Sequence, residues 1–174
     1  FLRRVIAAVR SEVGQDYPVW IKLGVAGRPE GGLPLAEGAA AARLCRDQGV
    51  DAIEISNAAG EPEGLPSGEG RFMPMAVAVR QAVGPDYPLA VVNGFRSRNG
   101  MQTALDGGSV DLISLCRPLI AEPHLVRKLE SGAIKRALCV RCDRCVPEEQ
   151  CLGVGCYNGG VQRAVAQRTD AAGY

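Results

Sequence analysis

The stretch Arg10-Ser-Glu-Val-Gly-Gln-Asp-Tyr-Pro-Val-Trp-Ile-Lys-Leu-Gly24 decides the fold, because it returns 70 residues later as Arg80-Gln-Ala-Val-Gly-Pro-Asp-Tyr-Pro-Leu-Ala-Val-Val-Asn-Gly94. Each copy reads as the end of a helix with a glycine at its C-cap, Gly14 or Gly84, followed by an Asp-Tyr-Pro turn. A short apolar strand closed by a glycine comes next. The repeat therefore predicts the same helix-to-strand junction twice.

Two further strands are predicted around this repeat. The apolar run Val50–Ser56 follows an alanine-rich helix, Leu35–Gln48, which Gly49 ends. The run Val110–Cys116 follows a helix around Asn99–Asp106. Short strands that alternate with helices are joined by crossovers, and such crossovers produce a parallel sheet.

Parallel α/β sheets occur chiefly as doubly wound sheets or as (β/α)₈ barrels. A 70-residue repeat matches two βα units of about 35 residues each, and a complete barrel needs eight strands in roughly 250 residues. The four predicted strands therefore indicate an α/β fold that is half of a TIM (β/α)₈ barrel. A small flavodoxin-like sheet is the alternative, because it would explain four strands without further sequence.

Composition narrows the class of function. The chain has 174 residues, 47% of them hydrophobic, and a formal net charge of +1 without a long basic block. We therefore expect a small-molecule substrate and no nucleic-acid or membrane partner. No signal-peptide core is recognisable, which predicts a cytoplasmic protein. The sequence begins without methionine inside an amphipathic helix, and we expect further residues before Phe1.

In a barrel the working residues lie at the carboxyl ends of the strands. Here these positions are Lys22, Ser56-Asn57, Asn93-Gly94-Phe95-Arg96 and Cys116-Arg117. The loops after the last two strands of a barrel commonly bind phosphate through backbone N–H groups, helix N-termini and a bidentate cation.

Two helix starts accompany these loops. Ser97 is a candidate N-cap for the helix after the third strand, and a further helix is expected to start near Glu122-Pro123. Gly94, Phe95, Arg96, Cys116 and Arg117 could together form a phosphate site.

The run from Val92 to Leu129 resembles the last strands of the Old Yellow Enzyme family, and most closely its 2,4-dienoyl-CoA reductase-like branch. The motifs that carry the resemblance are Asn-Gly-Phe-Arg-Ser-Arg-Asn-Gly-Met, Val-Asp-Leu-Ile and Cys-Arg-Pro-Leu-Ile-Ala-Glu-Pro-His-Leu. The Ile-Lys-Leu strand, Gly31-Gly32-Leu33 and the Gly49–Ser56 strand are similar to the family's fifth and sixth strands. The resemblance thus identifies the chain as about strands 5–8, the C-terminal half of the barrel.

The resemblance implies an FMN-dependent oxidoreductase, ene-reductase-like, that passes hydride from NADH or NADPH to an activated alkene such as an enone or an enoyl thioester. The implied FMN-binding residues are Lys22, Asn93, Gly94, Phe95, Arg96, Cys116 and Arg117. A fixed charge at Lys22 would stabilise the reduced flavin. Asn93-Gly94 stands where many members have Gly-Gly, and Cys116 stands where a small residue is usual. The family's substrate-binding and proton-donating residues belong to the first half, so no catalytic residue is assigned here.

Five of the seven cysteines lie in the last part of the chain. The C-x₂-C-x₂-C run Cys139, Cys142, Cys145 is followed by Cys151 and Cys156. Closely spaced thiolates can hold a [4Fe–4S] cluster or a structural zinc ion, and a metal-free loop is the third alternative. The resemblance favours the iron–sulfur cluster, with Cys156 rather than Cys151 as the fourth ligand, although the family has one more residue between the second and third cysteines.

We therefore predict three segments, namely a half of the FMN-binding barrel at 1–132, a cysteine-rich metal or cluster segment at 133–160 and a tail at 161–174. The missing N-terminal half of the barrel, or a second copy of the chain, is the expected partner, because a half-barrel has two open edge strands. Two other functions stay open at this point. One is a non-catalytic half-barrel scaffold, and the other is a phosphate-binding aldolase or isomerase that uses Lys22 and Arg117.

Overall fold

The computed structural model describes residues 1–145 and 153–172. The chain forms two compact units. The first contains Phe1–Asn93 and Thr103–Ser114, and the second contains Gly94–Gln102 and the chain from Leu115 onward.

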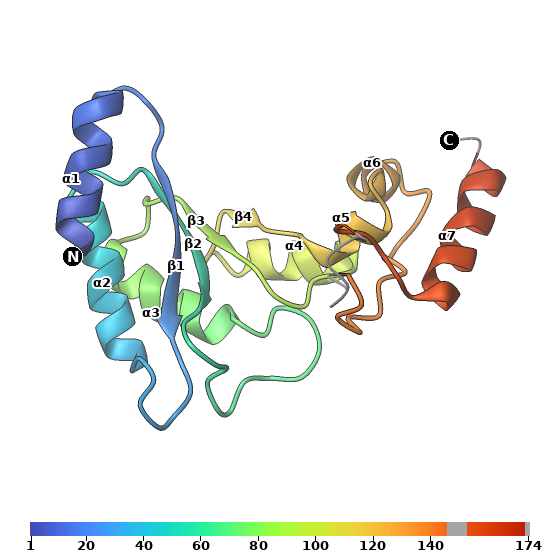
Figure 1. Cartoon of the computed structure of the whole chain (residues 1–174), viewed down its shortest axis with the longest axis horizontal. Coiled ribbons are helices and arrows are strands. Elements are labelled where there is room, and N and C mark those ends of the chain that lie inside the picture. The colour runs from blue at the N-terminus through green and yellow to red at the C-terminus, as the bar shows by residue number, and fades with distance from the viewer. Residues whose placement is uncertain (146–152, 173–174) are drawn as a thin grey trace. The chain divides into compact units, whose positions relative to one another are not determined.

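The first unit is built on a four-stranded parallel sheet (Figure 1). Its strands are β1 (Trp20–Ala26), β2 (Ala52–Asn57), β3 (Leu89–Val91) and β4 (Leu112–Ile113). They lie in sequence order, β1-β2-β3-β4, and every neighbouring pair is parallel. A flavodoxin-like sheet would place its strands out of sequence order, so the sequential order agrees with the predicted barrel half. The fourth strand is much shorter than the predicted Val110–Cys116.

Helices α1 (Leu2–Val13), α2 (Leu35–Asp47), α3 (Met73–Val83) and α4 (Arg98–Asp106) alternate with these strands. The predicted C-cap glycines are confirmed. The N–H groups of Gly14 and Gly84 donate to the carbonyl oxygens of Arg10 and Arg80, both at 2.9 Å. Both glycines have positive φ, 81° and 95°, which residues with a side chain rarely adopt.

One face of the sheet forms the core of the first unit. Alternate side chains of the strands are fully buried, as the strand period of two requires, and they are Val25, Ile53, Ile55, Leu89 and Val91. Helices α2 and α3 contact each other, α2 contacts β1 and α3 contacts β3. Gly38 permits the close approach of α2, because a Cβ atom there would lie 1.8 Å from the carbonyl oxygen of Val25.

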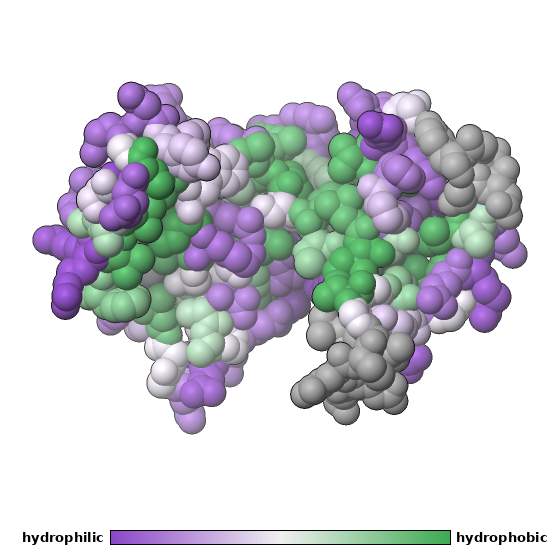
Figure 2. Space-filling view, turned by 45° about the horizontal axis from the view of Figure 1, so that its top comes forward, coloured by the Kyte–Doolittle hydropathy of each residue, from purple (hydrophilic) through white to green (hydrophobic). Residues whose placement is uncertain are grey.

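The opposite face of the sheet is much less covered. Trp20, Lys22 and Leu112 point to this face in the strand alternation and are 54%, 57% and 43% exposed. Apolar side chains reach the surface in several places, as Figure 2 shows. In a closed barrel this face is the packed interior.

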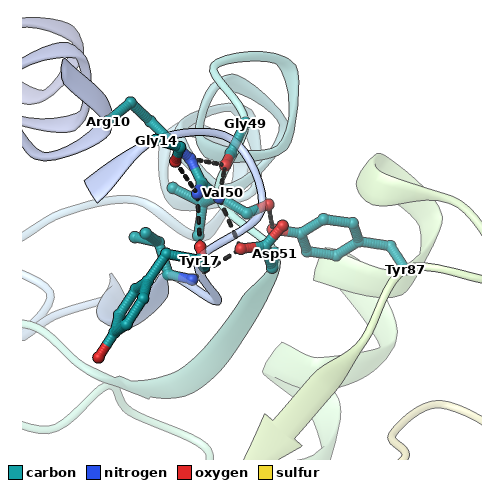
Figure 3. A network of polar contacts seen from close by, with 8 residues as sticks. Arg10, Gly14, Tyr17, Gly49, Val50, Asp51 and Tyr87 are labelled. Atoms are coloured by element: carbon teal, nitrogen blue, oxygen red, sulfur yellow. Dashed lines mark hydrogen bonds and ion pairs between the residues drawn. The ribbon is translucent and has the colours of Figure 1, made fainter. Parts of the chain in front are cut away.

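The repeat is stabilised by an arginine at the end of each helix. Arg10, 7% exposed, donates to the carbonyl oxygens of Gly14, Tyr17 and Gly49 and pairs with Asp51 at 2.5 Å (Figure 3). Arg80 makes the equivalent set, in which Gly84, Tyr87, Ser109 and Asp111 replace those four partners. Asp51 and Asp111 also accept the N–H groups of Val19 and Leu89, at 2.6 and 2.8 Å. One arginine thus fixes the helix end, the turn and the start of two strands in each copy.

The second unit contains α5 (Arg117–Ala121), α6 (Leu125–Glu130), α7 (Gly159–Ala172) and the first part of α4. The helix expected to start near Glu122-Pro123 is α6, which begins at Leu125 with His124 at its N-cap. The short helix α5, which begins at Arg117 with Pro118 in its first turn, was not expected. Glu122 and Pro123 lie between α5 and α6. Residues 161–172 of the predicted tail lie within α7, and its last two residues lie outside the described part of the chain.

Glu122 is the polar centre of the second unit. Its carboxylate is 0% exposed and accepts the N–H of Leu138 at 2.7 Å and a 2.8 Å ion pair from Arg168. A buried carboxylate is tolerated only when it is paired and hydrogen-bonded in this way. Glu122 therefore ties α7 and the segment before Cys139 to the end of α5.

The described helices include none that is long and apolar enough to cross a membrane.

Candidate cofactor site

Lys22 is the third residue of the seven-residue strand β1 and lies on the open face of the sheet, so it does not end the strand as the sequence analysis expected. Its register partner on β2 is Glu54, and the Lys22 ammonium and the Glu54 carboxylate form an ion pair. Glu54 is 24% exposed and holds the lysine over the sheet. Sequence reasoning missed Glu54, although a glutamate one strand away at the same register is the expected partner for a strand lysine.

The loop after β3 turns through two residues with positive φ. Asn93 has φ 91° and Gly94 has φ 92°. Glycine is favoured in this left-handed conformation, and asparagine is among the few residues with a side chain that adopt it readily. Ser97 caps the following helix as predicted, since its hydroxyl accepts the N–H of Gly100 at 3.0 Å.

The same loop is bonded to the segment just before the cysteines. The N–H of Ala137 donates to the carbonyl oxygen of Arg96 at 2.7 Å, and the Arg96 guanidinium donates back to the carbonyl oxygen of Ala137 at 3.4 Å. Ser97 and Arg136 form an antiparallel bridge. Phe95 is buried, 3% exposed, and anchors the loop. The backbone of the predicted phosphate loop is thus held by Arg136 and Ala137.

Arg117 is the first residue of α5, directly after the exposed Cys116 at the N-cap. Its guanidinium Nη1 forms an ion pair with Oδ1 of Asp143, which lies between the second and third cysteines of the C-x₂-C-x₂-C run. Asp143 had no assigned role in the sequence analysis, because the two residues are 26 positions apart and no periodic pattern relates them.

Backbone strain marks both predicted cofactor loops. Among the described residues, the ones other than glycine with positive φ are Asn93, Arg141 and Asp143. The first lies in the predicted phosphate loop, and the other two flank Cys142. Such a conformation costs on the order of 1–3 kcal/mol for a residue such as arginine and less for asparagine or aspartate, and these conformations cluster at ligand-binding sites.

The four predicted metal ligands lie in one region of the second unit. Cys139 is buried in an apolar cluster against which Cys156 packs. Burial raises the pKa of the Cys145 thiol, and the neighbouring Cys139 raises it further. The backbone N–H of Arg144 and the side-chain amide of Asn158, 3.3 Å from the sulfur, lower the pKa of the Cys142 thiol.

These thiols do not form a finished metal site. No group of three or more His, Cys, Asp or Glu side chains within residues 1–145 and 153–172 is placed to hold a metal ion. The donor set itself fits a thiolate-bound metal, since Cys139, Cys142, Cys145 and Cys156 are free thiols. Cys151, expected to be dispensable, lies outside the described residues.

The predicted flavin residues are divided between the two units. Lys22 and Asn93 belong to the first unit, and Gly94, Phe95, Arg96, Cys116 and Arg117 belong to the second. Within the second unit the backbone brings the phosphate loop next to the segment that leads into the cysteines.

Comparison with known proteins identifies the family. The model of the NADH:flavin oxidoreductase / NADH oxidase family matches residues 1–136, which is more than half of the chain. The chain belongs to this family. The match contains every predicted flavin-binding residue and ends three positions before Cys139.

Individual relatives are matched at modest identity and over only part of their own length. The 4,4'-dithiodibutanoate disulfide reductase of Rhodococcus erythropolis is 33% identical over 47% of this chain and 20% of its own length. The NADH oxidase of Thermoanaerobacter brockii is 25% identical over 92% of this chain and 24% of its own length. The chain therefore spans about a quarter or less of these two relatives.

Solved structures of the family have the same fold. A 2-naphthoyl-CoA reductase in complex with 2-naphthoyl-CoA superimposes with a TM-score of 0.67 and 25% identity over 79% of this chain and 22% of that chain. The Old Yellow Enzyme homologue of Zymomonas mobilis gives a TM-score of 0.58 with 23% identity, over 80% of this chain and 38% of that chain. These matches confirm the expectation that the chain is part of a TIM barrel of the Old Yellow Enzyme type.

Proposed function

We propose that the chain is the FMN-phosphate-binding half of an NAD(P)H-dependent ene-reductase-like enzyme, with a [4Fe–4S] cluster in its cysteine-rich segment. The observation that carries the proposal is the position of the three strained residues Asn93, Arg141 and Asp143. In the described chain, left-handed backbone without glycine occurs only in the two loops to which the sequence assigns cofactors. Binding loops are where such strain is normally retained.

Each proposed flavin residue has a physical role. The Asn93-Gly94 turn would bring backbone N–H groups to the phosphate, and the Arg117 fork would bind two of its oxygens. Phe95, Arg96 and Cys116 shape the two loops. Lys22 would face the flavin, with its ammonium oriented by Glu54. Bound FMN would supply the hydride relay between the nicotinamide and the alkene.

The net reaction reduces a carbon–carbon double bond with one hydride and one proton, while NAD(P)H is oxidised to NAD(P)⁺. The family resemblance assigns the substrate contacts and the proton donor to the first half of the barrel. We therefore propose no catalytic residue among residues 1–174 and regard an enone or enoyl thioester as the substrate class. The relative that binds 2-naphthoyl-CoA supports the thioester.

The iron–sulfur assignment rests on the cysteine spacing and on the contacts among the thiols. Cys139 and Cys156 share one apolar cluster, and Asn158 connects the Cys142 sulfur to the start of α7. The NADH oxidase match covers 92% of the chain, so it extends beyond residue 136 into this segment. Four thiolates from these positions would complete a [4Fe–4S] cube.

The phosphate assignment is tested by Arg117→Ala. We expect the variant to bind FMN about tenfold more weakly or worse, because a bidentate charge-assisted contact is lost. Quenching of flavin fluorescence on titration gives the dissociation constant. Arg127→Ala, at an exposed position on α6, is the matched control and should bind FMN as the wild type does. Equal FMN affinity in Arg117→Ala and the wild type would reject the assignment.

The ligand set is tested by metal analysis of anaerobically prepared protein. We expect about four iron atoms per chain, lost in Cys142→Ser and retained in Cys151→Ser. Cys45→Ser is a second control, since this buried thiol belongs to α2 in the first unit. One zinc ion per chain and no iron would reject the cluster and show that these cysteines hold a structural zinc ion instead.

A further inference from the structure

Arg117, the residue proposed to bind the flavin phosphate, is already bonded to the cysteine loop, which consists of residues 139–145 and is completed by Cys156. Arg117 starts α5, and its Nη1 pairs with the carboxylate of Asp143. Arg117 is 32% exposed, and Asp143 is 77% exposed. A guanidinium has five N–H donors in a rigid planar fork. One pair with a carboxylate occupies Nη1 and leaves other donors of the fork for phosphate.

The position of Asp143 depends on the conformation of the cysteine loop. Asp143 has φ 59° and directly follows Cys142 in the chain. The neighbouring backbone is bonded to the segment around Cys156, since the N–H of Tyr157 donates to the carbonyl oxygen of Arg144 at 2.9 Å. The N–H of Gly155 donates to the carbonyl oxygen of Cys145 at 3.1 Å. The backbone that carries Asp143 is therefore bonded to the segment that carries Cys156.

Asn158 is a further connection between the cysteine loop and α7. Its amide contacts the Cys142 sulfur, and its Oδ1 accepts the N–H groups of Gly160 and Val161, both at 3.1 Å, at the start of α7. Cys142, which directly precedes Asp143, thus contacts the residue that caps the 14-residue helix α7. Arg117, Asp143 and the four proposed metal ligands all belong to the second unit.

We propose that Asp143 is a positioning residue that orients Arg117 toward the flavin phosphate, and that it couples flavin binding to metal loading of the cysteine loop. This inference rests on the proposed function. A loaded loop fixes Asp143, which holds the Arg117 fork in its binding orientation, so FMN binds more tightly to the loaded chain. By thermodynamic reciprocity, bound FMN raises the affinity of the loop for its metal by the same factor.

The experiment compares FMN affinity in two states of the full chain, one stripped of metal by a chelator and one reconstituted anaerobically with iron and sulfide. For the wild type we expect reconstitution to tighten FMN binding about tenfold, within the usual range of coupling between two sites. In Asp143→Asn, which keeps the size of the side chain and removes its charge, both states should bind FMN equally, at the level of the stripped wild type. Asp86→Asn, an exposed carboxylate in the first unit, should behave as the wild type.

The outcomes separate this inference from the proposed function. If Arg117→Ala loses FMN affinity but Asp143→Asn keeps the metal dependence, the coupling is wrong and the phosphate assignment stands. If Arg117→Ala binds FMN normally, the proposed function fails first. A wild type that takes up no iron, or whose FMN affinity is the same in both states, also overturns the coupling.

A second readout does not depend on flavin binding. The Nε–Hε signal of Arg117 in a nitrogen-15 NMR spectrum should shift when the wild-type loop is reconstituted, because the guanidinium changes its surroundings. The shift should disappear in Asp143→Asn. A signal that moves equally in both proteins would contradict the coupling, even if the chain bound no FMN in either state.

Discussion

Tyr17 and Tyr87 occupy the same place in the repeat but make different contacts. The Tyr87 hydroxyl donates a 2.6 Å hydrogen bond to the carbonyl oxygen of Val50, and burial raises the pKa of Tyr87. Tyr17 is 62% exposed. Two sites with one local sequence thus differ because the second copy has the β2 segment beside it, whereas the first copy lies at the sheet edge.

We predict that Tyr87→Phe lowers the free energy of unfolding by about 1 kcal/mol, since the buried Val50 carbonyl loses its side-chain donor. Tyr17→Phe is the matched control and should change stability by less than about 0.5 kcal/mol, as is usual for an exposed site. Urea unfolding of the three proteins measures both values. Equal losses in the two variants would mean that the contact with Val50 contributes nothing.

At the scale of elements, the helix-to-strand junction is the unit that the chain repeats. The ion pair between Arg10 and Asp51 in the first junction predicts that the stability of the fold depends on pH. The backbone N–H of Val19 and the Arg10 guanidinium hold the pKa of Asp51 below its ordinary value. A carboxylate whose pKa is lower in the folded than in the unfolded chain stabilises the fold above the unfolded-state pKa, near 4. This stabilisation is lost as the pH falls through the folded-state pKa.

Asp51→Asn should therefore be less stable than the wild type at pH 7, by on the order of 1 kcal/mol, because the carboxylate is half exposed and partly screened by solvent. The difference should be smaller at about pH 3, because protonation of this carboxylate in the unfolded chain has by then removed part of its stabilising effect. Urea unfolding at the two pH values tests this, with Asp86→Asn as the control. A gap that stays constant between the two pH values would rule out Asp51 as its origin.

The elements also show where sequence reasoning succeeds and where it stops. The repeat predicted both junctions and both cap glycines because each is encoded within a few neighbouring residues. The ion pairs Lys22–Glu54 and Arg117–Asp143 could not be predicted in this way, since they join residues 32 and 26 positions apart. The shortness of β4 likewise depends on pairing with β3 rather than on local propensity.

At the scale of the whole molecule, the chain matches only part of each relative. The relatives described above are matched over about a fifth to two-fifths of their length. Two edge strands, β1 and β4, and an open sheet face with Trp20 and Leu112 agree with a sheet that pairs with further strands.

We predict that residues 1–174 alone show no NAD(P)H-dependent reduction of enones or enoyl thioesters, because the proposed substrate and proton-donor groups belong to the other half. Steady-state turnover measures this.

The most direct test of the half-barrel account is sedimentation velocity of residues 1–174 with FMN, detected at the visible absorbance of the flavin. The account predicts that the chain sediments as a dimer or larger species through its open edges, and that flavin sediments only with this species. A monodisperse monomer of 18.3 kDa that carries FMN would contradict it. Such a result would mean that the four strands form a self-contained flavin-binding fold.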